Sequence, residues 1–208
     1  MNTQFHVIST GMQPLEQFVT IAAHIHPYVD AIHVREKTKT ARELADFISA
    51  LVARGVPARK IIVNDRVDVA AVFGVKGVQL AYHSLSAKTV KAHFPSLVVG
   101  CSVHSLEEAM EAEKSGADYC LYGHVFPTEC KRGVPPRGLE TLKTIASSIY
   151  IPVIAIGGIQ PDNVKQVLQS GASGIAVMSG VFLAKDPLAQ VKEYARMVKK
   201  WGEDFNEW

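Results

Sequence analysis

The chain has 208 residues, of which 48% are hydrophobic and 20% charged, and its formal net charge is +2. This composition is typical of one globular domain, and it excludes a disordered or fibrous chain. The basic residues form no run of five or six like charges, which argues against a nucleic-acid partner.

The sequence also lacks the patterns of a membrane span, a signal peptide and a cysteine motif. No window approaches the ~18 uncharged apolar residues of a membrane span, and Met1–Thr10 lacks the features of a signal peptide. We therefore expect a cytoplasmic protein with no membrane partner. Three cysteines, Cys101, Cys120 and Cys130, lack CxxC spacing, so we expect reduced thiols rather than disulfides or a structural zinc site.

Short apolar, β-branched runs predict eight strands. They cover Phe5–Ser9, Ala31–Arg35, Lys60–Asn64, Gly77–Leu80, Leu97–Ser102, Tyr119–Tyr122, Val153–Ile156 and Gly174–Val177. The segments between them have apolar residues at helical spacing, as at Leu15, Phe18, Val19 and Ala22. Ser105 and Glu108 predict a capping box, and Pro161 predicts another helix start.

The alternation of strand and helix predicts a parallel sheet, because parallel neighbours need a crossover that a helix provides. Eight such units favour a closed (β/α)8 TIM barrel, which we predict as a single domain over residues 1–208. An open doubly wound sheet is the alternative, but Ser9–Pro14 has one glycine where that fold usually carries GxGxxG. The aromatic tail Trp201–Trp208 is expected to be a packed or frayed end.

In such barrels the active site lies at the carboxyl ends of the strands. The second strand leads into Arg35 and Lys37, and strand alternation points His33 and Arg35 into the barrel if Ile32 and Val34 face the helices. An inward arginine is costly unless it meets an anion, so these cations predict anion binding. A solvated loop or a salt bridge with Glu36 is the alternative.

Glycines follow the seventh strand, and a short helix follows the eighth. Backbone without Cβ atoms approaches an anion closely, and the free amides of a helix start point at its oxygens, so these loops predict a phosphate site. Tight turns alone are the alternative. The residues of this predicted site are Gly157, Gly158, Val177, Met178 and Ser179.

Histidines end several strands. His124 follows the sixth strand at the catalytic rim, where its imidazole could move a proton near neutral pH; a structural histidine is the alternative. Cys130 lacks an identifiable pairing base, which argues against a cysteine nucleophile. Paired acidic ligands are missing near His83 and His104, so we expect no metal site.

Six motifs together resemble the thiamin phosphate synthase superfamily, over nearly the whole chain. They are HVREK at 33–37, NDRVDVA at 64–70, GCSVHSLEEA at 100–109, GHVFPTECK at 123–131, PVIAIGGI at 152–159 and GIAVMSG at 174–180. The synthase of this superfamily joins a thiazole phosphate to a pyrimidine pyrophosphate, using magnesium held by acidic residues after the third and fourth strands.

Two departures favour the TenI-type thiazole tautomerases of the superfamily. Asp65 matches the first magnesium-binding position of the synthase, but Ala81–Ser84 lacks the second carboxylate. In the sixth loop the synthase has proline after glycine, whereas His124 stands there in this chain and matches the histidine proposed as acid/base in the tautomerases.

The resemblance implies an isomerase that converts an exocyclic dihydrothiazole carboxylate phosphate to the aromatic carboxythiazole phosphate by proton transfer at His124. It implies a small thiazole phosphate as substrate and no cofactor, and it is compatible with a homo-oligomer. The implied substrate-binding residues, besides the glycine loops, are Arg35, Lys37, Asn64, Ser102, Thr128 and Lys131. The alternatives are the magnesium-dependent synthase and a non-catalytic TenI-type regulator that binds a thiazole phosphate.

Overall fold

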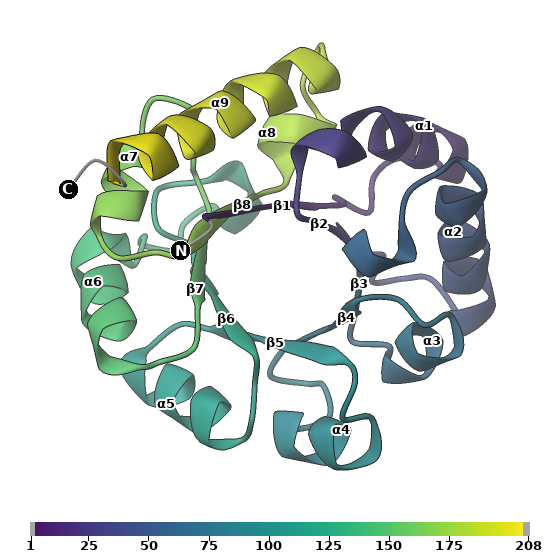
Figure 1. Cartoon of the computed structure of the whole chain (residues 1–208), viewed down its shortest axis with the longest axis horizontal. Helices are drawn as coiled ribbons and strands as arrows, with labels where there is room; N and C mark the ends of the chain where they lie inside the picture. Colours follow the sequence, from purple (N-terminus) through teal and green to yellow (C-terminus); the bar gives the residue numbers. More distant parts are fainter. Residues whose placement is uncertain (1–2, 206–208) are drawn as a thin grey trace.

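The computed structural model describes residues 3–205, so residues 1–2 and 206–208 of the predicted 1–208 domain lie outside it. Its strands form one closed barrel in which each strand pairs in parallel with the next and β8 pairs with β1 (Figure 1). Helices surround the barrel on the outside (Figure 1). The predicted (β/α)8 TIM barrel is therefore confirmed.

Every predicted strand is present and agrees with the structure to within one residue at each end. The strands are β1 Gln4–Ile8, β2 Ala31–Val34, β3 Ile61–Asn64, β4 Gly77–Leu80, β5 Val98–Val103, β6 Tyr119–Gly123, β7 Val153–Ile156 and β8 Gly174–Val177. Their short apolar runs are buried on both sides, as a parallel barrel requires.

Helices follow the strands, and short 3-10 turns accompany three of the connections. The α-helices are α1 Leu15–Ile25, α2 Ala41–Ala53, α3 Val67–Val72, α4 Ala87–His93, α5 Leu106–Lys114, α6 Gly138–Ser148, α7 Val164–Gln169, α8 Ser179–Phe182 and α9 Pro187–Phe205; the 3-10 turns are η1 His26–Tyr28, η2 Ala58–Lys60 and η3 Glu129–Lys131. Within residues 3–205, none of the helices is long and apolar enough to cross a membrane.

Two predicted helix starts differ from the structure in detail. The Ser105 side chain caps α5 by accepting from the Glu108 amide at 3.2 Å, as predicted. The Glu108 carboxylate, however, accepts from the His104 amide at 2.6 Å and so binds one residue before the cap. Pro161 lies in a turn, and α7 begins three residues later at Val164.

The main core lies between the barrel and its helices. Ile32 and Val34 belong to this outer core, so His33 alternates to the inner face, as predicted, and Arg35 follows the end of the strand. The long helix α9 packs against α1, α7 and α8. Trp201, from the predicted tail, packs against the same core.

The barrel interior is unusually polar. Barrel interiors are normally filled by bulky branched residues, but His6 and His33 are 1% and 0% exposed inside this one. A hydrogen bond of 3.1 Å joins His6 Nδ1 to His33 Nε2, and a second one of 2.9 Å joins His6 Nε2 to Gln4 Oε1. Burial lowers the pKa of both histidines, that of His33 to about 3, so both rings are neutral at pH 7.

These neutral histidines make stability depend on pH. The unfolded chain binds protons near the ordinary histidine pKa of 6.5, whereas the folded chain does not. The free energy of unfolding is therefore highest above that pKa and falls as the pH drops towards the folded value, by about 2 kcal/mol for His33 between pH 7 and pH 5, and His6 contributes in the same direction. Urea unfolding at both pH values should show a smaller loss for His33→Gln than for the parent; equal losses would contradict the prediction.

Candidate active site

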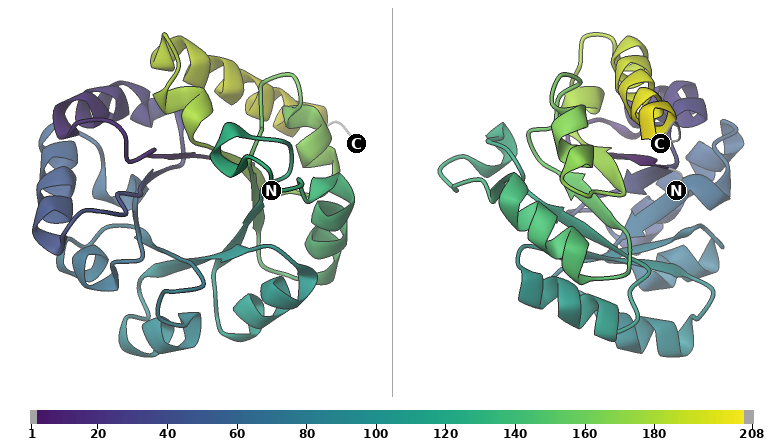
Figure 2. Two further views of the ribbon diagram at one scale, coloured as in Figure 1. Left: turned by 180° about the vertical axis from the view of Figure 1, so that it is seen from behind. Right: turned by 60° about the vertical axis from the view of Figure 1, so that its left-hand side comes forward.

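The loops that follow the strands gather at one end of the barrel. The β6–α6 loop, residues 124–137, projects from this end (Figure 2). Since the eight strands are parallel, all their carboxyl ends meet here, and this is the end where barrel enzymes bind substrates. Every site residue predicted from the sequence lies in or beside these loops.

Cations from two of the loops are crowded together. The positive charge of Arg35 is the main cause that lowers the pKa of Lys37, followed by burial and by the charge of Lys131. Arg35 itself is half-buried, and burial lowers the pKa of its guanidinium. Within residues 3–205, none of these three side chains forms an ion pair with a carboxylate. We call Arg35, Lys37 and Lys131 the cation cluster, and its repulsion favours an anionic ligand.

Glu36 forms no ion pair with Arg35, so the salt bridge kept as an alternative is not formed, although the charge of Glu36 opposes the lowering of the Arg35 pKa by burial. Its carboxyl is buried, and burial raises its pKa. It is hydrogen-bonded to the Ser9 side chain and the Gly11 backbone, and Ser9 Oγ accepts from the Arg35 amide at 2.8 Å. Glu36 thus connects the loops after β1 and β2, a role the sequence analysis missed because buried and solvated glutamates look alike in a sequence.

Asn64 and Asp65 end β3. Asp65 has a positive φ of 66°, which aspartate tolerates better than most residues, and its amide donates to the Gln79 carbonyl at 2.9 Å. Its half-exposed carboxylate lies 3.9 Å from His83 Nε2. No cluster of three metal-ligating side chains occurs in the described part of the chain. The Oδ1 atom of Asn64 is buried without a hydrogen-bond partner.

Ser102 lies at the end of β5, and its Oγ accepts from Gln79 Nε2 at 3.1 Å. Gln79 in turn accepts from the Tyr119 hydroxyl. Sequence analysis missed both partners, although a glutamine inside the apolar run Gly77–Leu80 was the available signal. Thr128 caps η3, where its hydroxyl accepts from the Cys130 amide at 3.4 Å.

His124 follows β6 and is buried against its own loop. Its Nε2 donates to the Val134 carbonyl at 3.2 Å, and its carbonyl accepts from the Arg137 amide at 2.9 Å. These two hydrogen bonds fasten the far end of the β6–α6 loop to the strand. The structure therefore gives His124 a structural role in addition to its place at the rim.

Gly157 and Gly158 have a packing reason to be glycines. Both have positive φ angles, of 102° and 66°. A Cβ at Gly157 would lie 2.3 Å from the Cβ of His124, and one at Gly158 would lie 2.5 Å from the Pro127 carbonyl oxygen. The pair thus allows the β6–α6 loop to approach β7, which does not depend on a phosphate.

The residues after β8 contribute mainly backbone to the rim. The side chain of Val177 packs in the outer core, and α8 begins at Ser179 with amides that have no acceptor inside the helix. Tyr194 of α9 lies beneath, where it donates to the Ile159 carbonyl at 2.9 Å and limits the space at Gly180. This tyrosine therefore holds the loops after β7 and β8 together.

The structure brings only part of the predicted site into direct contact. The cation cluster is coupled by charge, and the two glycines touch the segment that begins at His124. Asn64 and Ser179 form no hydrogen bond with another predicted site residue within residues 3–205. They share the rim with the other residues, and a substrate that spans the rim is needed to connect them.

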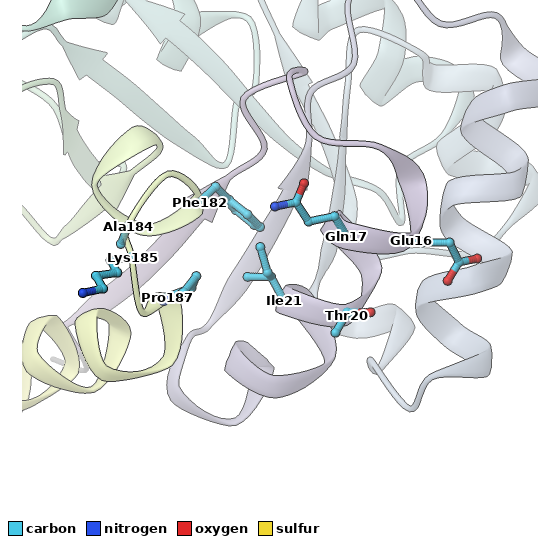
Figure 3. Close-up of a pocket in the computed structure, with 8 residues that line it drawn as sticks. All are labelled: Glu16, Gln17, Thr20, Ile21, Phe182, Ala184, Lys185 and Pro187. Atoms are coloured by element: carbon cyan, nitrogen blue, oxygen red, sulfur yellow. The ribbon is translucent and has the colours of Figure 1, made fainter.

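A groove on the outer wall lies away from this rim. It runs between α1 and the segment around α8 (Figure 3). Phe182, Ile21 and Gln17 surround its centre, whereas Glu16 and Lys185 point outward at opposite ends (Figure 3). It lacks the convergent charges of the rim, so we assign the chemistry to the strand ends.

Comparisons with known proteins identify the family. The profile of the family described as "Thiamine monophosphate synthase" matches residues 5–181. A thiamine-phosphate synthase from Pyrococcus furiosus is 43% identical over 172 residues, 82% of this chain and 83% of the relative. One from Methanococcus vannielii is 34% identical over 206 residues, 95% of this chain and 96% of the relative.

Solved structures show the same similarity. A thiamine phosphate pyrophosphorylase from Pyrococcus furiosus superposes with a TM-score of 0.82 at 35% identity, covering 96% of this chain and 97% of the other. A 3-hexulose-6-phosphate synthase superposes with a TM-score of 0.72 at 19% identity, with coverage of 93% and 99%, which shows the shared fold alone.

These names correct the function predicted from the sequence. The relatives are synthases and not isomerases, so the predicted thiazole tautomerase function is wrong. The missing carboxylate after β4 was given too much weight, because magnesium is often held by one or two carboxylates together with substrate phosphates. The chain belongs to the thiamine monophosphate synthase family.

Proposed function

We propose that the protein is a thiamine-phosphate synthase, a transferase that joins a thiazole phosphate to a pyrimidine pyrophosphate and releases inorganic pyrophosphate. The relatives of similar length carry this name. The observation that carries the proposal is the cation cluster, which forms no ion pair with a carboxylate within the described residues and stands at the catalytic end of the barrel. We place this reaction between small molecules in the cytoplasm.

The leaving pyrophosphate fits the cation cluster. Charge is transferred to this group as its bond to the pyrimidine breaks, so fixed positive charges close to it stabilise the transition state. Arg35 is already half-buried and held from its backbone by Ser9, which limits the reorganisation needed on binding. Lys37 and Lys131 approach from different loops, and binding the anion relieves their mutual repulsion.

A magnesium ion also fits the residues present. The half-exposed carboxylate of Asp65 would hold it, with pyrophosphate oxygens and water as the remaining ligands, which is the usual way magnesium binds at phosphate sites. When bound, the ion supplies charge neutralisation at the leaving group. The chain itself positions Asp65 through the hydrogen bond that the Asp65 amide donates to the Gln79 backbone carbonyl.

The thiazole phosphate fits the loops after β7 and β8. These are the loops that form phosphate sites in many barrels of this fold. Backbone amides at Gly157, Gly158, Met178 and Ser179 supply donors there, and binding them fixes the thiazole ring relative to the pyrimidine. Tyr194 supports both loops from below.

Removing one cation tests the proposed pyrophosphate site. Purified protein with both substrates and magnesium should form thiamin phosphate, and Arg35→Gln should lower kcat/KM by about tenfold or more, since a hydrogen bond to a charged group contributes about 1.5–3 kcal/mol. The exposed Arg59, in η2 at the opposite end of the barrel, provides the matched control, and Arg59→Gln should leave the rate unchanged. A parent protein that forms no thiamin phosphate would exclude the proposed function.

Asp65→Asn tests the magnesium ligand. Asparagine tolerates the same positive φ, so the loop should keep its conformation while losing the charge. We expect the magnesium concentration for half-maximal activity to rise by about tenfold or more, as expected for the loss of a charged contact. Asp68→Asn is a matched control on the adjacent helix, because Asp68 is paired with Arg66. If both variants respond to magnesium like the parent, Asp65 is not the ligand.

A charge added after β8 tests the thiazole phosphate site. Ser179→Asp should raise the KM for thiazole phosphate by about tenfold or more through repulsion of the phosphate, with little change in the KM for the pyrimidine substrate. Ser96→Asp, exposed in the turn before β5, adds the same charge at the other end of the barrel. Gly158→Val is unsuitable, because its side chain would collide with Pro127. An unchanged KM in Ser179→Asp would place the phosphate elsewhere.

A further inference from the structure

Three neighbouring strands place a row of side chains inside the barrel below Ser102. Gln79 of β4 is in register with Gly100 of β5, and Gly100 is in register with Tyr119 of β6. Gln79 and Tyr119 are 1% and 6% exposed. Ser102 lies two residues beyond Gly100 on the same face of β5, so it is the rim residue directly above this row.

A hydrogen-bonded chain runs along the row in one direction. The Tyr119 hydroxyl donates to Gln79 Oε1 at 2.6 Å, and Gln79 Nε2 donates to Ser102 Oγ at 3.1 Å. Burial raises the pKa of Tyr119, so the phenol keeps its proton. Turning the Gln79 amide around would leave that buried proton without its acceptor, which is costly, so the phenol fixes the orientation of the amide.

Gly100 provides the space for this pair. A Cβ there would lie 2.2 Å from Tyr119 Cζ and 2.4 Å from Gln79 Oε1. Gly100 has no positive φ that would require glycine. A glycine inside a strand weakens it and often marks a close approach. The strand therefore lacks a side chain at the point where the tyrosine and the glutamine meet.

The direction of the chain determines what Ser102 offers to a ligand. Its Oγ already accepts a hydrogen from Gln79, so its own hydroxyl proton remains for an acceptor at the rim. We propose that Gln79, locked by Tyr119, is a positioning residue that makes Ser102 a hydrogen-bond donor to an oxygen of the pyrophosphate group. This inference rests on the proposed synthase function for the identity of that anion.

A double-mutant cycle between Tyr119→Phe and Ser102→Ala tests the inference. The readouts are the affinity for inorganic pyrophosphate with magnesium, by calorimetry, and kcat. Tyr119→Phe frees the Gln79 amide to turn, so both quantities should fall by about threefold to tenfold, the scale of one neutral hydrogen bond. In the Ser102→Ala background the same change should have no further effect, because the residue through which it acts is gone.

Tyr122→Phe is the matched control. Tyr122 lies on the same strand but faces outward, and its hydroxyl donates to the Gly138 carbonyl at 3.3 Å. It should alter neither readout. Gln79→Met, which keeps the volume and removes the amide, should reproduce Tyr119→Phe and serves where the phenylalanine variant folds poorly.

The outcomes separate the inference from the proposed function. Equal losses in both Ser102 backgrounds, or no loss at all, would overturn the positioning role. A parent that binds pyrophosphate but forms no thiamin phosphate would overturn the synthase function alone, and the cycle would still be read from the affinities. A parent that does not bind pyrophosphate would overturn both.

Discussion

Closure of the eight-stranded barrel points every second side chain of each strand into a confined interior, and this constraint governs the polar chemistry of the protein. A buried polar group is costly unless it is hydrogen-bonded. Polar residues on β1, β2, β4 and β6 therefore bond to one another, as in the pairs His6–His33 and Gln79–Tyr119. These pairs lie below the rim, so the residues that satisfy the interior also support the residues that face the ligand.

Electrostatics at the rim work in the opposite sense to those in the interior. Inside, groups are kept neutral: burial lowers the pKa of His33 and raises that of Tyr119. At the rim, Arg35 and Lys37 lie close to each other, neither forms an ion pair with a carboxylate within residues 3–205, and their repulsion lowers the pKa of Lys37. A neutral interior beneath a rim that carries clustered cations concentrates positive potential where an anion can reach it.

The strands and the barrel could be predicted from the sequence because β-branched runs and helical spacing repeat eight times with little irregularity. The rim could be located for the same reason, since each strand end marks a rim residue. The buried partners Gln79 and Glu36 could not, because their roles depend on register between strands and on contacts between loops. The specific function was predicted wrongly from two positions, although most of the synthase pattern, including Asp65, was present.

His124 illustrates how a single residue can be over-interpreted. A histidine at a catalytic rim suggests proton transfer. Here its ring and its carbonyl also bind Val134 and Arg137. Lys131 belongs to the loop that these bonds close. Its positive charge repels that of Lys37, so holding it near the other cations of the cluster costs electrostatic energy. Anchoring the loop at both ends opposes that repulsion before any ligand binds, so the cluster is assembled in advance and the anion needs to supply less ordering energy.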